Sequence, residues 1–153
     1  MQSWVENDEN LEQGKSTYFK IEGCVTWLPG LSEGKPAYYL SCQTCKKKVT
    51  DEDHGFHCIS CDQTYKEANP NYIFQAKVCD YSSAAFVSFM GDTGNSVLGM
   101  EASELHEIYQ GGENVDEKVK EIIEESYFKP MALIVRAKRE AFNGEPSTIR
   151  YIA

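Results

Sequence analysis

Residues 42–61 read CQTCKKKVTDEDHGFHCISC, a stretch in which two Cys-x-x-Cys pairs are separated by twelve residues. Each pair forms a tight turn that presents two thiolates, and a tetrahedral Zn²⁺ takes four such ligands at about 2.3 Å. The residues between the pairs hold an Asp- and Gly-rich turn flanked by short extended runs, which is typical of a β-hairpin. The stretch therefore predicts a zinc ribbon, in which one structural Zn²⁺ is bound by Cys42, Cys45, Cys58 and Cys61.

Other uses of these cysteines stay open from the pattern alone. A single Cys-x-x-Cys pair can be a redox dithiol, and two disulfides would suit a secreted protein. His54 or His57 lies near enough in the sequence to replace one cysteine ligand. Four thiolates already fill a tetrahedron, however, and a closed Cys₄ site leaves no position for a catalytic water. The two remaining cysteines, Cys24 and Cys79, fall in apolar runs and are expected to be small buried residues.

The chain has 153 residues and a net charge of −9, from 24 acidic and 15 basic residues. This length suits one domain. Residues 1–12 and 101–125 hold more than half of the acidic residues, and elsewhere the basic residues slightly outnumber the acidic ones. A local basic groove for nucleic acid is therefore compatible with the acidic total. No apolar run is long enough to span a membrane and no targeting segment is visible, which favours a reducing compartment, the cytosol or the nucleus.

Five segments alternate between apolar and polar residues, as β-strands with one buried face do. They lie at 18–28, 72–79, 85–90, 131–142 and 148–153. Two helices are predicted between the third and fourth strands, at 101–109 and 115–126. Five strands with a helical segment in this place is the order of an OB-fold, a five-stranded Greek-key barrel. The expected fold is thus all-β with helices, and the zinc ribbon, at about 38–67, is inserted between strands 1 and 2.

The first strand sets the start of the predicted domain. Alternation places Trp27 on the same face as Phe19, Ile21 and Val25, and Gly23 is expected to form a bulge. Residues 1–16 are polar and acidic and show no apolar periodicity. They are expected to form a flexible linker before an OB-fold domain at 17–153.

Several short strings, in this order along the chain, are shared with a known family. They are Cys42-x-x-Cys45-Lys-Lys-Lys-Val49, Cys58-x-x-Cys61-Asp62, Asn71-Tyr72-Ile73, Phe86-Val87-Ser88-Phe89, Val97-Leu98-Gly99 and Phe142-Asn143-Gly144-Glu145 through Ile149-Arg150. With these strings, about residues 17–153 resemble the zinc-containing, most C-terminal DNA-binding OB domain of the replication protein A large subunit. A ribbon alone occurs in many folds, but a ribbon at this point of an OB-fold together with these strings is specific.

The resemblance implies single-stranded DNA binding in replication, repair or telomere maintenance. It also implies a nuclear protein that works with other subunits of a replication protein A-like or telomerase-associated complex. Phe86 on the third strand and Phe142 at the start of the loop between the fourth and fifth strands correspond to aromatic positions of the family. They are the expected stacking platforms for bases, and such contacts are typically worth about 1–3 kcal/mol each.

Basic residues on outward faces are expected to contact phosphates, which would make the affinity depend on salt. They are Lys77, Arg136 and Lys138, with Lys47 beside the zinc extending the track. Each of these assignments has a simpler alternative. An outward aromatic can pack beneath a loop, and a surface lysine is usually only solvated.

One departure from the family pattern points to a diverged member. The family usually has a wider spacing than the two residues between Cys42 and Cys45. A telomere or telomerase paralogue is therefore the alternative within the family.

Two alternatives come from other functional classes. The acidic helical region at 101–125 favours a protein-interaction module that anchors partner subunits and has little DNA affinity. An enzyme is not expected. The sequence has no complete Walker-type phosphate loop, no Gly-x-Gly-x-x-Gly string and no His-Glu-x-x-His string.

Overall fold

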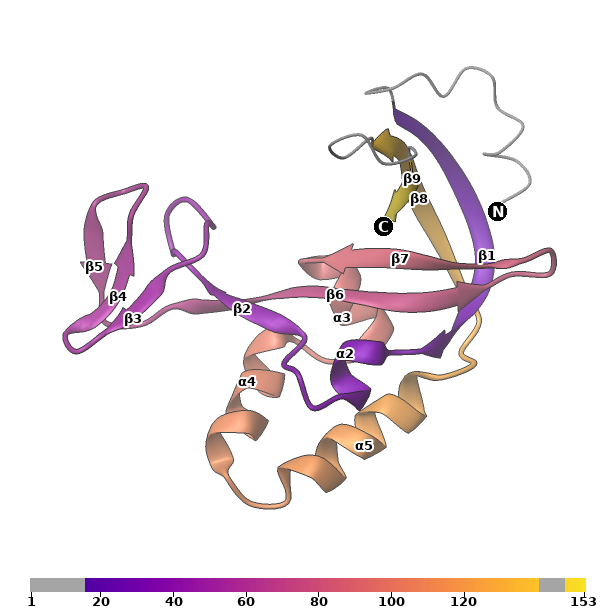
Figure 1. The fold of residues 1–153 in the computed structure, drawn as a ribbon. Coiled ribbons are helices and arrows are strands. Elements are labelled where there is room, and N and C mark those ends of the chain that lie inside the picture. Colours follow the sequence, from indigo (N-terminus) through magenta and orange to yellow (C-terminus); the bar gives the residue numbers. More distant parts are fainter. Residues whose placement is uncertain (1–15, 141–147) are drawn as a thin grey trace.

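The computed structural model describes residues 16–140 and 148–153. Five strands close into a barrel in the order β1-β6-β7-β9-β8, and β8 pairs with β1 to complete it (Figure 1). All neighbouring pairs are antiparallel except β7 and β9, which run parallel. The predicted OB-fold is confirmed. The strands are β1 Ser16–Trp27, β6 Asn69–Cys79, β7 Ala84–Met90, β8 Met131–Glu140 and β9 Thr148–Ile152.

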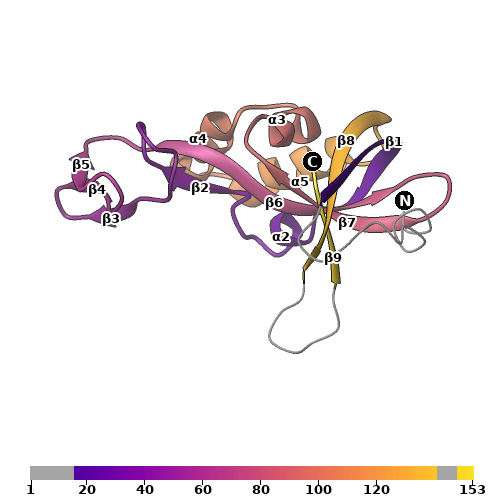
Figure 2. The ribbon, with the colours of Figure 1, turned by 90° about the horizontal axis from the view of Figure 1, so that it is seen from above.

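Three helices connect β7 to β8, and they lie on one side of the barrel (Figure 2). They are α3 Asp92–Leu98, α4 Ala102–Gly111 and α5 Val115–Ser126. The prediction for α5 is confirmed and that for α4 is shifted by one to two residues, whereas α3 was not predicted. None of the helices in the described ranges is long and apolar enough to span a membrane.

The ends of these elements follow local chemistry. At the start of α4, Glu101 and Glu104 form a reciprocal capping box, in which the Glu101 N–H donates to the Glu104 carboxylate at 2.7 Å. Strand β1 ends at Trp27, and a short helix, α2 Pro29–Ser32, follows it. Proline suits this first helical position because its ring fixes φ near the helical value.

The core lies inside the barrel and between the barrel and the helices. Tyr72 is 1% exposed, and its hydroxyl donates to the Met100 carbonyl at 3.2 Å. On α5, Val119 and Ile122 are buried, as their helical spacing predicts. The largest fully buried hydrophobic side chains of this core are Tyr72, Phe89, Leu28, Leu105, Val25, Val78, Val87 and Val135.

Strand β1 changes partner near its centre. Its first part pairs with β8 as far as Gly23, and its second part pairs with β6 from Cys24 onward. At this change the two backbones approach closely, and a Cβ added to Gly23 would collide with the carbonyl oxygen of Cys79. The prediction of a bulge at Gly23 is wrong, because the register shift lies between Val25 and Trp27. Glycine serves the close approach instead.

We predict that Gly23→Ala destabilises the protein by about 1–3 kcal/mol, because the colliding atom belongs to the backbone of β6 and cannot rotate away. Chemical denaturation, comparing the free energies of unfolding, measures the effect. Gly30→Ala is the matched control, since an added Cβ there meets no atom within 4 Å. Equal stability of the two variants would contradict the close approach.

The cysteine-rich segment is inserted between β1 and β6, which are the first two strands of the OB-fold. Strand β2, Tyr38–Ser41, pairs with the first residues of β6. Three short strands form a separate sheet beyond the N-terminal end of β6 (Figure 1). They are β3 Thr50–Glu52, β4 Gly55–Cys58 and β5 Gln63–Tyr65.

Candidate metal centre and nucleic-acid interface

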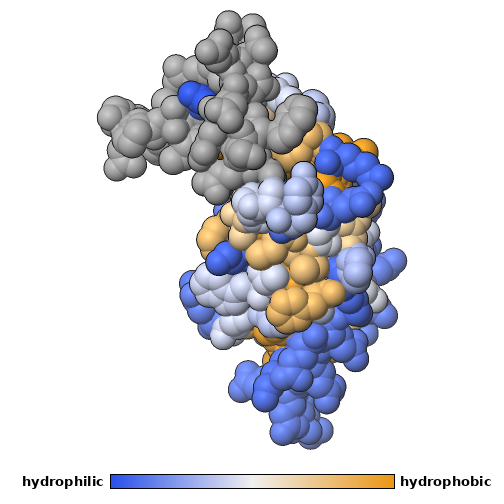
Figure 3. Space-filling model, turned by 90° about the vertical axis from the view of Figure 1, so that its right-hand side faces the viewer, coloured by the Kyte–Doolittle hydropathy of each residue, from blue (hydrophilic) through white to orange (hydrophobic). Residues whose placement is uncertain are grey.

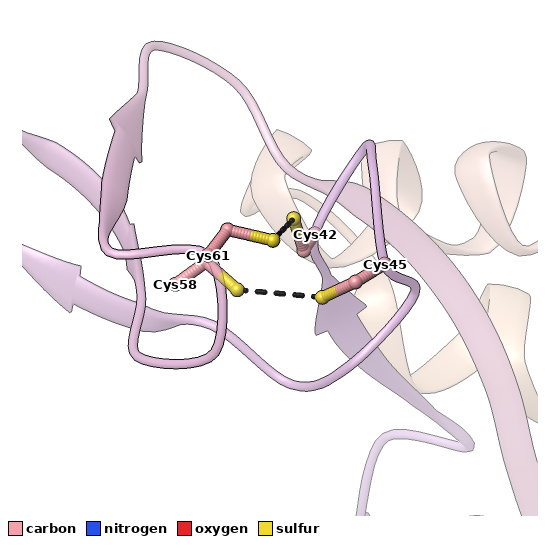
Figure 4. A group of neighbouring side chains, drawn as sticks. All are labelled: Cys42, Cys45, Cys58 and Cys61. Atoms are coloured by element: carbon pink, nitrogen blue, oxygen red, sulfur yellow. Dashed lines mark hydrogen bonds between the residues drawn. The ribbon is translucent and has the colours of Figure 1, made fainter.

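Four cysteine side chains from two turns point toward one another (Figure 4). The sulfurs of Cys42 and Cys61 are 3.9 Å apart, those of Cys45 and Cys58 are 3.5 Å apart, and all four lie within 4.8 Å of one another. A tetrahedron with metal–sulfur bonds of about 2.3 Å has edges of about 3.8 Å. The cluster therefore has the dimensions of a Cys₄ metal site.

The two turns that carry the cysteines are built alike. Each Cys-x-x-Cys pair is followed by a residue with positive φ, Lys46 at 62° and Asp62 at 51°. In the first turn the Lys46 N–H donates to the Cys42 carbonyl at 3.1 Å, and in the second the Cys61 N–H donates to the Cys58 carbonyl at 3.3 Å. Closing each turn in this way points both of its thiols to the same side.

The electrostatics of the cluster favour a bound cation. Backbone N–H groups of Cys45 and Thr44 lower the pKa of Cys42 to about 6, despite its burial. Hydrogen bonding to the Cys45 sulfur, together with burial, raises the pKa of Cys61 to about 12. Four thiolates this close repel one another, and a divalent cation among them is what allows all four to lose their protons.

Two residues near the cluster have other partners. His57, considered as an alternative ligand, places Nδ1 3.2 Å from the Thr64 hydroxyl, and within the described ranges the candidate metal group consists of the four cysteines. Lys47 donates from Nζ to the Ser60 hydroxyl at 3.0 Å and so links the two cysteine turns. Lys47 is thus placed in the ribbon, away from the other basic residues predicted to bind DNA.

A row of three residues crosses the outer face of the barrel. Trp27 on β1 is the register partner of Lys77 on β6, which in turn pairs with Phe86 on β7. The Trp27 and Phe86 rings meet at 62° with centroids 5.9 Å apart, and they are 43% and 45% exposed. Lys77 is also exposed. Exposed rings beside an exposed cation suit the stacking of bases and the binding of phosphates.

The expectation that Trp27 shares a face with Val25 is wrong, because Val25 is fully buried and Trp27 is 43% exposed. Strict alternation from Val25 puts Trp27 inside. The bulge at Thr26 adds one residue to β1 and turns Trp27 to the outside. Phe86 lies on the outer face as predicted, and it packs against Trp27 rather than beneath a loop.

The same face continues along β6 and β7 toward the ribbon. Gln75 and Ser88 are register partners, and the Gln75 amide donates to the Ser88 hydroxyl at 3.4 Å. The next outward pair is Ile73 and Met90, which are 50% and 47% exposed. A polar residue pair and then an apolar residue pair therefore follow the aromatic row toward the ribbon.

Basic residues lie beside this face on β8 and β9. Arg136 and Lys138 pair with Ile152 and Arg150, and β9 lies next to β7 where Ile152 pairs with Ser88. In this register Arg150, two residues before Ile152, is level with Phe86 of β7. Arg150 therefore lies beside the basic residues Lys77, Arg136 and Lys138, and the sequence had not predicted it as one of the group. Phe142, predicted to stack on bases, lies outside the described residues.

Comparison with known proteins places this arrangement in a family. A family model described as "Replication factor-A C terminal domain" matches residues 18–152. One of the replication protein A 70 kDa DNA-binding subunits of Arabidopsis thaliana is 26% identical over 144 residues, which cover 94% of this chain and 22% of the relative. The corresponding 70 kDa protein of Xenopus tropicalis, also named as a DNA-binding subunit, is 27% identical over 141 residues, with 90% and 22% covered. The chain thus spans about a fifth of the length of these relatives.

Solved structures agree with the fold. A replication protein A heterotrimer bound to single-stranded DNA superposes with a TM-score of 0.76 at 26% identity, covering 95% of this chain and 33% of that one. A yeast replication protein A bound to single-stranded DNA gives 0.77 at 20% identity, covering 98% and 82%, and at this identity it shows the fold alone. Since the family model matches nearly the whole chain, this protein belongs to the family of replication factor-A C-terminal domains.

Proposed function

We propose that this chain binds single-stranded DNA across the outer face of the barrel, with a structural Zn²⁺ in the cysteine cluster. The observation that carries the proposal is the row of Trp27, Lys77 and Phe86, in which two half-exposed rings flank a cation on adjacent strands. The relatives named as DNA-binding subunits, and the solved heterotrimer bound to single-stranded DNA, support it.

The geometry divides the work between two kinds of contact. Bases would stack on Trp27 and Phe86, and such contacts tolerate any sequence because every base has a flat aromatic face. The backbone phosphates would pair with the cations beside the rings, namely Lys77, Arg136, Lys138 and Arg150. Zn²⁺, held by the four cysteines, would supply no chemistry beyond fixing the ribbon.

The wider setting rests on the same relatives. We place the protein in the nucleus, as a module of a replication protein A-like assembly with other subunits, because the structural neighbour is a heterotrimer and the relatives are replication proteins. A telomere or telomerase paralogue is the narrower version of this proposal. It would bind G-rich repeats more tightly than mixed sequence.

A salt-resolved titration against single strands tests the proposal. If each of the four cations neutralises one phosphate, log K should fall with log [salt] at a slope of about −3, or roughly 50-fold between about 50 and 200 mM. A mixed sequence and a G-rich telomeric repeat are compared in the same buffer. Equal affinity for the two excludes the telomeric version, and no binding at low salt excludes the DNA-binding proposal.

A matched pair of variants places the interface on this face. Arg136→Ala should reduce the salt slope by about 0.7–1 and weaken binding to all sequences alike. Lys120→Ala is the control, because Lys120 lies on α5 and faces Glu124 at 3.9 Å. Equal effects of the two substitutions would mean that the slope reports overall charge rather than this face.

A second candidate is a protein-interaction module. Exposed acidic side chains cover the outer surface of α4 and α5, among them Glu107, Glu117, Glu121 and Glu124. Such a surface suits a basic partner protein and repels DNA. Retained capture of partner subunits by a chain with no measurable single-strand affinity at low salt would decide for this candidate.

A further inference from the structure

Two cysteines outside the metal cluster lie opposite each other on adjacent strands of the barrel. Cys24 on β1 and Cys79 on β6 are direct register partners, the first pair after β1 leaves β8. Directly opposed residues of antiparallel strands have Cα atoms about 4.5–5.5 Å apart, and disulfides form at about 4.4–6.8 Å. The strand pairing therefore sets a backbone separation that a disulfide between Cys24 and Cys79 can span.

Both thiols lie on the outer face of the barrel. The next register pair, Val25 and Val78, is fully buried, so alternation turns Cys24 and Cys79 outward. Both cysteines are partly exposed, which overturns the expectation that they are buried. These two cysteines are opposed and partly exposed, whereas a cysteine buried in apolar surroundings is inert.

An open groove borders one of the two cysteines. An open groove of about 500 Å³ is lined by Cys24 together with Glu22, Phe128 and Met131. Apolar side chains gather across the middle of the side of the molecule shown in Figure 3. The groove is large enough to admit a small peroxide beside Cys24.

Thr26, the extra residue of the β1 bulge, contacts the second thiol. Its hydroxyl oxygen is 3.3 Å from the Cys79 sulfur and donates to the Lys77 carbonyl at 3.3 Å. With its proton on that carbonyl, the hydroxyl accepts from the Cys79 thiol. Rotation of the hydroxyl toward the sulfur would let it donate to a Cys79 thiolate instead, which stabilises the form that reacts.

We propose that Cys24 and Cys79 are an oxidation site that forms an intramolecular disulfide with a hydroperoxide, independently of the metal cluster. One thiolate attacks a peroxide oxygen, which breaks the O–O bond and gives a sulfenic acid and hydroxide. The second thiol then attacks that sulfur, forming the S–S bond and releasing water. In the balanced reaction, two thiols lose two hydrogen atoms and one hydrogen peroxide is reduced to two water molecules.

The covalent link has a defined structural result. It joins β1 to β6 directly and closes a loop that contains the whole ribbon insertion. A disulfide across a loop of this length restricts the unfolded chain, so the oxidised protein should melt roughly 5–10 °C higher than the reduced one.

The test treats the zinc-loaded protein with dilute hydrogen peroxide and follows three signals together. Intact mass should fall by two hydrogen atoms, peptide mapping should join the peptides that carry Cys24 and Cys79, and zinc content should not change. Dithiothreitol should restore the original mass and melting temperature. Release of zinc with Cys24 and Cys79 still reduced would overturn the proposal, as would oxidation of either residue to a sulfinic acid without a cross-link.

Single substitutions give the matched controls. Cys24→Ser and Cys79→Ser should each abolish the cross-link and the rise in melting temperature, while the reduced variants keep their zinc. A stabilising effect of peroxide that survives either substitution would show that another group is the target. Peptide mapping of the unsubstituted protein tests for the Cys24–Cys79 cross-link even where a variant folds poorly.

Discussion

Removing the metal will unfold the ribbon and leave the barrel folded. The ribbon's own core is small: its buried members are Cys42, Val49 and Cys58, and two of these belong to the cysteine cluster proposed to hold zinc. Structural zinc sites of this kind supply about 10–16 kcal/mol of binding energy that is also folding energy in zinc-finger peptides. The barrel has a separate and much larger core, which contains none of the four ligands.

Hydrogen exchange with and without a zinc chelator measures this directly. Amides of β3, β4 and β5 should lose their protection, whereas those of β6, β7 and β8 keep theirs. Cys58→Ala should reproduce the chelated state, and Cys24→Ser, which lies outside the cluster, should bind one zinc per chain like the original protein. Unchanged protection of β4 after chelation would contradict a structural role for the ion.

Replacing both rings of the aromatic row will remove most of the affinity for single-stranded DNA. Each base–aromatic contact is worth about 1–3 kcal/mol, so Trp27→Ala and Phe86→Ala should each weaken binding by roughly 5- to 150-fold. Because the rings also contact each other at 5.9 Å between centroids, the losses will not add, and the double variant should lose less than the sum.

Binding by fluorescence anisotropy, at one fixed salt concentration, gives the three affinities. Phe128→Ala is the control: Phe128 is a 68% exposed aromatic in the segment between α5 and β8, outside the row. Melting curves of each variant separate loss of binding from loss of fold. An effect of Phe128→Ala equal to that of Phe86→Ala would show that exposed aromatics in general, rather than this row, govern affinity.

The sequence predicted the barrel strands and α5, but it placed Trp27 on the wrong face of β1. Alternation and turn residues located all five barrel strands, and the helical stripe located α5, because each depends on local periodicity. The short helices α2 and α3 were missed, since neither is long enough to show that periodicity. The cysteine spacing sufficed to bring four sulfurs together, because each turn is fixed within four residues.

Features that depend on how two strands pair could not be predicted from the sequence. Trp27 was misplaced because the bulge that turns it outward exists only in the pairing of β1 with β6. The opposition of Cys24 and Cys79 has the same origin, since residues 55 positions apart become neighbours only through register. Arg150 joins the basic group only through the parallel pairing of β9 with β7.

Strand β6 belongs both to the barrel and to the ribbon's support, since its first residues pair with β2 and its last with β1. Its eleven residues span about 36 Å and therefore fix the distance between the ribbon and the aromatic row. Inserting or deleting a single residue between Asn71 and Lys77 would reverse inside and outside for everything beyond that point. Exposed residues on β6 can thus be exchanged, but the number of residues between the ribbon and the aromatic row cannot change.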